Sequence, residues 1–227
     1  LCFYYGGSWR NCPAATRLPA GPLAPARERR AASLELDGET LTGPFVLLTN
    51  RHYPQKRFQD MFPVIERVRE TIPGATLLIT GAETVYTARL REEVAARGLG
   101  SAVRFLGLLP ERELDRVYRA AAAYVYPSPE EDFGMGIVEA MARGAPVIAW
   151  DNAGPTGILD RRSGRLVPLG DLDAFAEAVR SVLADPDHAD ALAAAAARRA
   201  RELFSQEAHT AILEDALYEA ASDSTRA

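Results

Sequence analysis

Short runs of apolar residues alternate with longer amphipathic segments from residue 44 onward. The apolar runs predict six strands, at 45–49, 76–80, 103–106, 123–126, 146–150 and 165–167. The amphipathic segments predict helices, one of about fifteen residues from residue 57 and others at 87–97, 111–122 and 137–143. Strands that are apolar on both faces are typical of a parallel sheet covered by helices. The pattern therefore predicts a doubly wound, Rossmann-like α/β domain that binds ligands at the carboxyl ends of its strands.

The last quarter of the chain has a helical pattern only. Three further helices are predicted, at 171–184, 189–203 and 205–220. We therefore expect one folded domain over residues 44–222 with C-terminal helices, followed by a short tail at 223–227.

Residues 1–43 show no lasting strand or helix period. They contain four prolines, a pair of adjacent glycines and a charged cluster at 27–30. This composition predicts a linker or an extended segment of uncertain structure. Its start is rich in aromatic residues, which suggests that it packs against another surface: Phe3, Tyr4, Tyr5 and Trp9.

Composition excludes several classes of protein. The chain has 227 residues and a net charge of −5, which argues against binding to nucleic acids or anionic membranes. No apolar run is long enough for a transmembrane segment. Cys2 and Cys12 are too few for a disulfide scaffold, which favours a reducing, cytoplasmic location. The chain starts at Leu1 and not at Met, and no signal-peptide pattern follows, so it is interpreted as a fragment or as a chain without its first residues. Whether it is a fragment or a natural subunit stays open.

The first strand is followed by two cations, Arg51 and Lys56, just before a predicted helix. Lys56 is the only lysine among the 26 basic residues. A guanidinium, an ammonium and the free N–H groups of a helix N-terminus are together suited to a phosphate. Taken alone, the pair also fits two solvated surface cations.

The fourth strand is followed by acidic residues and by Gly134 and Gly136, which allow the backbone to approach a ligand closely. Glu139 then lies within a short apolar helix, where a carboxylate is costly unless it has partners. Such a carboxylate suits the vicinal hydroxyls of a ribose. The acids of the first turn, among them Glu131, also fit simple stabilisation by the helix dipole.

The sequence does not support a protein kinase, a dinucleotide-binding site or a metal site. Residues 132–134 spell the kinase triplet DFG, but the other kinase motifs are missing. Residues 134–136 lack the third glycine of a dinucleotide-binding fingerprint. The three histidines are scattered and no HExxH or DxD spacing appears, so no metal is expected. His52 lies beside Arg51 and could face a phosphate, although a loop histidine is more often incidental.

The order of motifs over residues 45–222 resembles the C-terminal, donor-binding domain of retaining GT-B glycosyltransferases of family 4, in its mannosyltransferase-like branch. The strongest match is the E-x7-E signature of Glu131 and Glu139, followed in register by A-M-x-x-G-x-P-V-I-A. The R-x4-K spacing of Arg51 and Lys56 agrees with it. So do the segments F-L-G at 105–107 and G-x-L-V-P at 164–168, and Leu203-Phe204-Ser205.

The resemblance implies a role for each candidate residue. Glu139 would bind the ribose of a nucleotide diphosphate sugar. Glu131 would hold the transferred hexose together with the backbone of Phe133, Gly134, Met135 and Gly136. Arg51 and Lys56 would neutralise the departing diphosphate. The backbone of Leu109 would meet the nucleobase. No cofactor or metal is implied.

The resemblance also has departures. The family's G-G-x-x-E is replaced by 153–157, with Gly157 in the place of the acid. The N-terminal domain, which binds the acceptor in this family, has no counterpart in residues 1–43. Through that missing domain a cytoplasmic protein of this kind could also lie peripherally at a membrane. The motif variant favours GDP-mannose as the donor.

Three other interpretations stay open. The chain could be a non-catalytic nucleotide-sugar-binding subunit that docks to a separate acceptor-binding partner through an exposed apolar patch. It could be a nucleotide-sugar epimerase of GT-B-like fold, or a structural α/β domain.

Overall fold

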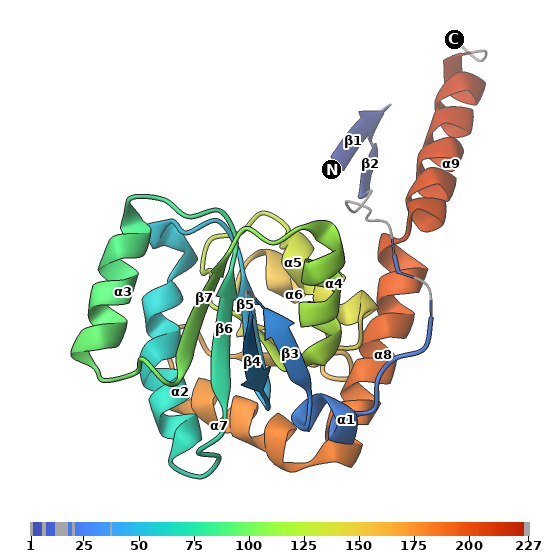
Figure 1. Cartoon of the computed structure of the whole chain (residues 1–227). Coiled ribbons are helices and arrows are strands. Elements are labelled where there is room, and N and C mark those ends of the chain that lie inside the picture. The colour runs from blue at the N-terminus through green and yellow to red at the C-terminus, as the bar shows by residue number, and fades with distance from the viewer. Residues whose placement is uncertain (1, 6–7, 12–17, 20, 37, 225–227) are drawn as a thin grey trace.

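A computed structural model of the chain describes residues 2–5, 8–11, 18–19, 21–36 and 38–224 (Figure 1). Its centre is a six-stranded sheet in the order β10-β9-β8-β5-β6-β7, with all neighbours parallel. The strands are β5 (Phe45–Thr49), β6 (Thr76–Thr80), β7 (Val103–Gly107), β8 (Ala121–Tyr126), β9 (Val147–Trp150) and β10 (Arg165–Val167). The predicted doubly wound α/β class and all six strands are confirmed.

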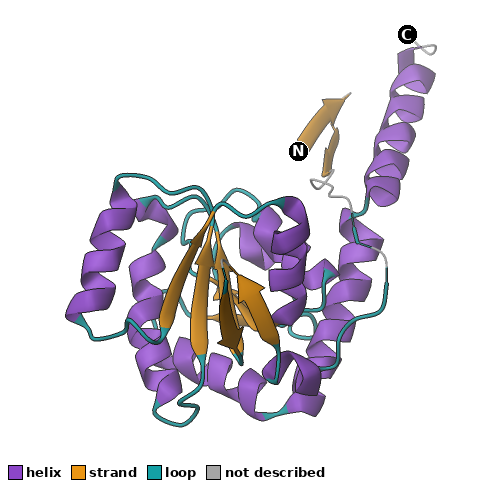
Figure 2. Cartoon of the chain, in the orientation of Figure 1, coloured by secondary structure: helices purple, strands orange, loops and turns teal. Residues whose placement is uncertain are grey.

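Helices cover both faces of this sheet (Figure 2). Alternate strand residues point to opposite sides, so Val46 and Leu48 join one core cluster while Phe45 and Leu47 join the other. The first cluster is closed by α2 (Met61–Arg69), α3 (Tyr86–Ala96) and α7 (Leu172–Ala184). The second is closed by α4 (Glu111–Ala120), α5 (Met135–Ala142) and the end of α8 (Pro186–Phe204).

The strand order places a crevice at one point of the sheet. From β5 the chain continues to β6 and β7 on one side, then returns to β8, which pairs with the other side of β5. The loops after β5 and β8 therefore leave the carboxyl edge in opposite directions, and such a switch point is where doubly wound sheets bind ligands.

One predicted helix begins later than expected. The segment from residue 57 starts with two 3-10 turns, Pro54–Lys56 and Phe58–Asp60, and α2 begins only at Met61. Arg57 joins these turns in the left-handed conformation, with φ of 54°, which a continuous α-helix cannot contain. The loop that carries Arg51 and Lys56 is therefore compact rather than helical.

The segment expected to be a linker carries regular structure in its described part. It contains the hairpins β1 (Cys2–Tyr5)–β2 (Ser8–Asn11) and β3 (Ser33–Leu36)–β4 (Glu39–Thr42), with α1 (Ala26–Arg30) between them. Leu34 and Leu41 are opposite each other in the second hairpin and are buried in the second core cluster. Arg29 of α1 is buried against Asp190 of α8. The side chains of the aromatic residues at 3–9 lie outside the described part.

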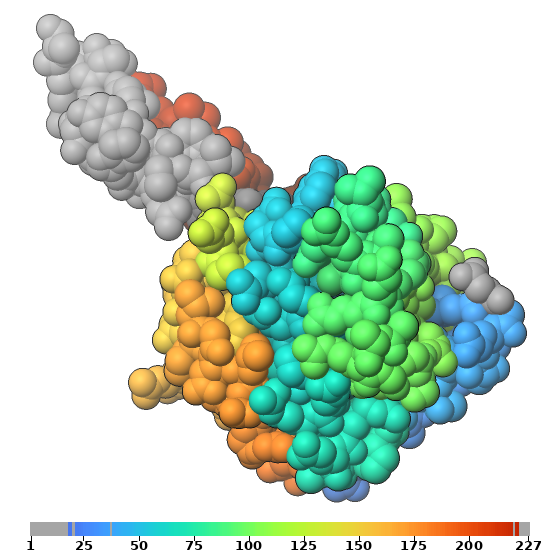
Figure 3. Space-filling model, turned by 90° about the vertical axis from the view of Figure 1, so that its left-hand side faces the viewer, coloured from blue at the N-terminus to red at the C-terminus, as the bar shows by residue number. Residues whose placement is uncertain are grey.

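The C-terminal helices begin at side-chain caps. Asp171 and Asp185 accept from the backbone N–H groups of α7 and α8, and the Ser205 hydroxyl accepts from the N–H of Ala208. The last helix, α9 (Gln206–Ser224), extends away from the body of the domain and includes the first two residues of the expected tail (Figures 1 and 3).

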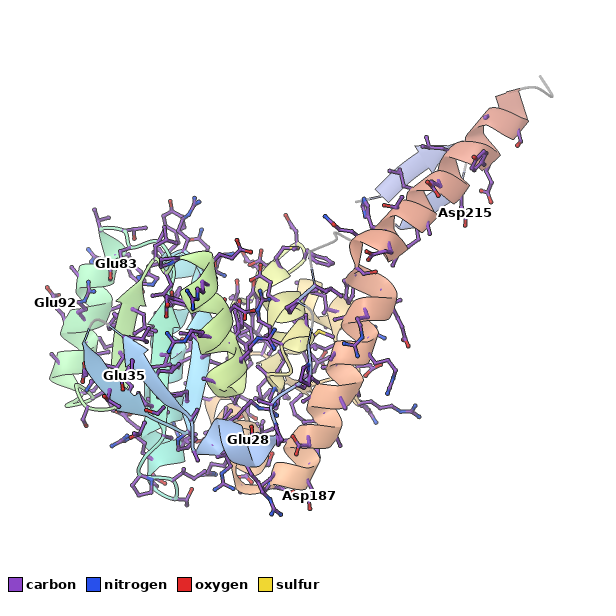
Figure 4. All side chains as sticks on the ribbon, turned by 45° about the vertical axis from the view of Figure 1, so that its right-hand side comes forward. Glu28, Glu35, Glu83, Glu92, Asp187 and Asp215 are labelled. Atoms are coloured by element: carbon purple, nitrogen blue, oxygen red, sulfur yellow. The ribbon has the colours of Figure 1, made fainter. Side chains whose placement is uncertain are left out.

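Acidic residues lie on many different elements of the fold. The net charge of −5 does not by itself reveal this distribution. The labelled carboxylates come from α1, β3, the loop before α3, α3, α8 and α9: Glu28, Glu35, Glu83, Glu92, Asp187 and Asp215 (Figure 4). Among the described residues, no helix combines the length and the apolar character that crossing a membrane requires.

Candidate functional site

The crevice between the loops after β5 and β8 is a cleft of about 640 Å³. All nine residues that the sequence nominates line it: Arg51, Lys56, Leu109, Glu131, Phe133, Gly134, Met135, Gly136 and Glu139. They come from three separate stretches of the chain, after β5, β7 and β8, and the strand order brings them together. The sequence therefore locates the site, while the roles of the individual residues stay predictions.

The loop after β5 supplies the cations of the cleft. Arg51 is exposed, and its guanidinium carbon lies 5.9 Å from the centroid of the Tyr53 ring. Its backbone N–H donates to the Asn50 side chain at 2.9 Å, which fixes the start of the loop. Lys56 ends the first 3-10 turn, and its N–H donates to the Tyr53 carbonyl. This compact turn directs both cations to one wall of the cleft.

Lys56 is paired across the cleft with Glu131. Its ammonium donates to Oε2 of Glu131, and the two side chains are only 17% and 21% exposed. The same carboxylate oxygen accepts the Tyr126 hydroxyl at 2.7 Å. Glu131 therefore has two hydrogen-bond partners, which explains why a half-buried carboxylate is tolerated here.

The N-terminus of α5 forms the floor of the cleft. Gly134 precedes it in the left-handed conformation, with φ of 106°. A Cβ on Gly136 would lie 2.4 Å from the Tyr124 hydroxyl oxygen, so only glycine lets the helix settle this closely onto the sheet. The Ile137 N–H donates to the Gly134 carbonyl at 2.9 Å, so the amides of Met135 and Gly136 are the ones left for acceptors of a ligand.

Glu139 lies one helical turn further along α5, half-buried and facing the cleft. Its Oε2 accepts the Tyr118 hydroxyl at 2.9 Å, and its carbonyl accepts from Arg143 at 3.1 Å. Among the described residues, Tyr118 is the one that hydrogen-bonds to the Glu139 side chain. Oε1 is therefore left for a ligand with adjacent hydroxyl donors.

The loop after β9 holds the acidic loop in place. The Asn152 amide donates to the Pro129 carbonyl at 2.6 Å, and the N–H of Gly154 donates to the Glu131 carbonyl at 2.8 Å. A Cβ on Gly154 would lie 2.3 Å from the Phe133 carbonyl oxygen. Gly157, in the place where the resembled family has an acid, is exposed and does not line the cleft. In this chain the segment supports the site without adding a charge to it.

His52 does not face the cleft. It is fully buried, its Nδ1 lies 3.0 Å from the Thr87 hydroxyl, and its ring packs edge-on against Phe58. Its carbonyl accepts the Thr84 hydroxyl. Burial lowers the pKa of His52, so the neutral imidazole is the stable form inside the protein. The expectation that His52 could face a phosphate is wrong, because the side chain is buried and the residue instead connects the loop after β5 to Thr84 and Thr87 at the start of α3.

Sequence reasoning missed four hydroxyl groups, three of which line the cleft (Thr49, Tyr118 and Tyr126) while Tyr124 lies behind them. They belong to Thr49 at the end of β5, to Tyr118 on α4, and to Tyr124 and Tyr126 on β8. The signal was present, because Tyr124 and Tyr126 are two residues apart on one face of an otherwise apolar strand. Buried tyrosines usually find partners for their hydroxyls, and here the partners lead to the two glutamates.

An apolar wall completes the cleft, formed by Leu108, Leu109 and Leu114 near the end of β7. Leu108 is 77% exposed, so this side of the cleft offers apolar surface to a ligand. Within the described residues, no group of three or more His, Cys, Asp or Glu side chains is placed to hold a metal ion.

Comparisons with known proteins bear on this site. The family described as "Glycosyl transferases group 1" matches residues 35–199. Glycogen synthase of Mycobacterium tuberculosis (strain CDC 1551 / Oshkosh) is 37% identical over 163 residues, which cover 70% of this chain and 37% of that protein. D-inositol 3-phosphate glycosyltransferase of Streptomyces coelicolor is 32% identical over 200 residues, covering 86% and 41%.

Among solved structures, sucrose-phosphate synthase from Thermosynechococcus elongatus is similar with a TM-score of 0.77 and 30% identity. The match covers 95% of this chain and 53% of that one. The chain thus spans about two fifths of the length of the two curated relatives and about half of this structure.

Proposed function

The chain belongs to the family of glycosyl transferases group 1, and from that premise we propose that its cleft binds a nucleotide diphosphate sugar. In this proposal the chain is the donor half of a hexosyltransferase that retains the configuration of the transferred sugar. The observation that carries it is the meeting of Glu131, Glu139 and two cations around the N-terminus of α5.

The cations fit the diphosphate. Arg51 and Lys56 lie on one wall of the cleft, and the free amides of α5 lie on its floor. When the bond between the sugar C1 and the phosphate oxygen breaks, negative charge grows on the diphosphate beside these groups. The acceptor oxygen bonds to C1, and its proton leaves to the diphosphate or to solvent. Two cations supply the charge that a metal would otherwise bring, so the reaction needs no added metal.

The carboxylates fit the sugars. Glu139 would accept the two ribose hydroxyls on its Oε1, since Oε2 is held by Tyr118. Glu131, with the backbone from Phe133 to Gly136, would hold the hexose. Leu109 would present its backbone to the nucleobase on the apolar wall.

The identity of the nucleobase and of the sugar in the donor needs its own argument. The motif variant favours GDP-mannose, but neither curated relative described above is named a mannosyltransferase. One is named a glycogen synthase and the other an inositol phosphate glycosyltransferase. The proposal therefore covers nucleotide diphosphate hexoses in general, with uridine and guanosine compounds tested side by side.

The acceptor site is proposed to lie on an N-terminal domain outside this chain. A cleft at the open edge of one α/β domain exposes the donor, and a second domain would cover it. A non-catalytic subunit that only binds the donor is the alternative, and transfer after addition of the acceptor domain would exclude it.

Calorimetric titration tests the donor site. UDP, GDP, UDP-glucose and GDP-mannose are each added to the chain without metal, and again to the variant Glu139→Ala. We expect one nucleotide to bind together with its sugar derivative, either UDP and UDP-glucose or GDP and GDP-mannose. The variant Glu139→Ala should bind these ligands at least about tenfold more weakly. The matched control is Glu92→Ala on the exposed face of α3, which should bind as the unmodified chain does. Equal affinity of the Glu139→Ala variant would refute the ribose assignment.

A further inference from the structure

A chain of three hydroxyl groups ends at Glu139; Thr49 and Tyr118 line the cleft and Tyr124 lies behind them. The Thr49 Oγ1 lies 2.8 Å from the Tyr124 hydroxyl and 2.9 Å from the Tyr118 hydroxyl. The Tyr118 hydroxyl in turn lies 2.9 Å from Oε2 of Glu139. These groups come from β5, β8, α4 and α5, so the hydrogen bonds connect four elements of the fold.

The direction of every proton in this chain follows from counting donors. A carboxylate can only accept, so the Tyr118 proton goes to Glu139. Tyr118 has no second proton, so Thr49 must donate to the Tyr118 oxygen. Thr49 has then used its only proton, so Tyr124 must donate to Thr49. The hydrogen bonds all point toward the carboxylate, and bonds aligned in this way strengthen one another.

The Tyr118 ring cannot easily turn away from this arrangement. It is buried, with the Arg143 guanidinium 5.1 Å from its centroid and the Tyr124 ring 5.7 Å away. Arg143 is itself fixed by Asp115 at 2.8 Å and by the carbonyl of Glu139 at 3.1 Å. Burial raises the pKa of Tyr118 and of Tyr124, so both hydroxyls keep their protons at neutral pH.

We propose that Tyr118, Thr49 and Tyr124 are positioning residues that orient Glu139 for the ribose of the donor. They occupy one carboxylate oxygen and fix the side chain in one rotamer, so that the other oxygen meets the ligand. The inference rests on the proposed function, because it assumes that Glu139 receives the ribose hydroxyls. It assigns selectivity for ribonucleotides over deoxyribonucleotides to hydroxyl groups that act through Glu139, two of which, Thr49 and Tyr118, also line the cleft.

The test measures ribose selectivity and not affinity alone. Calorimetry compares UDP and GDP with their 2′-deoxy and 3′-deoxy counterparts, in the unmodified chain and in Tyr118→Phe. We expect the chain to prefer the ribonucleotide by about tenfold and Tyr118→Phe to lose most of that preference. Deoxynucleotides should bind both proteins almost equally, because they make no use of the oriented carboxylate.

Two further variants keep the test decisive if Tyr118→Phe folds poorly. Thr49→Val removes the middle hydroxyl and should reduce the preference about threefold, whereas Thr49→Ser keeps the hydroxyl and should restore it. The matched control is Tyr218→Phe, an exposed tyrosine on α9. If Tyr118→Phe or Thr49→Val keeps the full ribose preference, the positioning role is wrong and the proposed function stands. If the unmodified chain binds neither nucleotide, the proposed function falls and the positioning role falls with it.

Discussion

Lys56 and Glu131, 75 residues apart in the chain, form an ion pair across the cleft. In the proposed function Lys56 binds the diphosphate of the donor and Glu131 binds its hexose. Without a donor, the two side chains are partners of each other. A ligand has to separate them, and a ligand with both a diphosphate and a hexose replaces the lost partner of each.

This pair predicts an unusual response to Glu131→Gln. A nucleoside diphosphate competes with Glu131 for Lys56, and leaves that carboxylate without a cation. The substitution removes the competitor, so the nucleoside diphosphate should bind about threefold to tenfold more tightly. The nucleotide sugar should gain less or lose affinity, because a neutral amide is a weaker acceptor for hexose hydroxyls than a carboxylate. Calorimetric titration with both ligands measures the ratio of their affinities in the variant and in the unmodified chain.

The matched control for this prediction is Glu130→Gln, an exposed neighbour that does not line the cleft. It removes the same charge from the same loop, so a general electrostatic effect would appear in both variants. An equal loss of affinity for both ligands in Glu131→Gln would contradict the account of the pair.

Lys56→Ala should weaken nucleoside diphosphate binding about tenfold at low salt. The loss should shrink as salt is raised, since counterions screen the attraction between an ammonium and a phosphate. Affinity for the nucleoside without phosphates should stay the same. A variant that loses both ligands equally at every salt concentration would show that Lys56 does not contact phosphate.

The strands were predictable from the sequence because each is buried on both faces. Runs such as Val46-Leu47-Leu48 carry no polar position, so their ends could be placed within two residues. The β3–β4 hairpin was missed although Asp37-Gly38 between short alternating runs is a typical turn signal. Its strands have four residues each and bury few side chains, so periodicity had little to detect.

The site was predictable where its residues stand in motifs and at strand ends. Arg51, Lys56 and both glutamates are polar groups at places that a doubly wound sheet uses for ligands. Thr49 and Tyr118 were not predictable, because each fits an ordinary core position in its own element. Only the packing of α4 against β5 and β8 brings the Tyr118 hydroxyl within hydrogen-bond distance of both Thr49 and Glu139.

His52 predicts how stability depends on pH. Burial lowers its pKa in the folded protein below the ordinary value of 6.5, while the unfolded chain keeps that value. The contribution of neutral His52 is complete above pH 6.5 and is lost as the pH falls toward the folded-state pKa. The free energy of unfolding should therefore decrease between about pH 7 and pH 5, before ordinary carboxylates titrate.

Urea unfolding at about pH 7 and about pH 5 measures this dependence. His52→Gln should be less stable at the higher pH and should show a flatter dependence over the same range. If His52→Gln and the unmodified chain have equal slopes, the buried imidazole is not the cause.

Ala153→Gly should stabilise the protein. Ala153 has φ of 49° and ψ of −136°, a conformation that costs a residue with a Cβ about 1–3 kcal/mol. Glycine relieves that strain and loses about 0.5–1 kcal/mol through the greater freedom of the unfolded chain. We expect a net gain of about 1 kcal/mol, seen as a rise in Tm of about 2–4 °C. Ala194→Gly, in the exposed middle of α8, should instead lower Tm.

The most direct test of the donor site uses the single lysine. Reductive methylation followed by mass spectrometry of the peptide with Lys56 reports its accessibility, because no other lysine side chain is present. The account predicts that a saturating nucleotide diphosphate sugar slows the methylation of Lys56 at least about fivefold, while the same concentration of its nucleoside does not. Methylation of Lys56 at the same rate with and without every nucleotide sugar tested, UDP-glucose and GDP-mannose included, would contradict the claim that the diphosphate binds in this cleft.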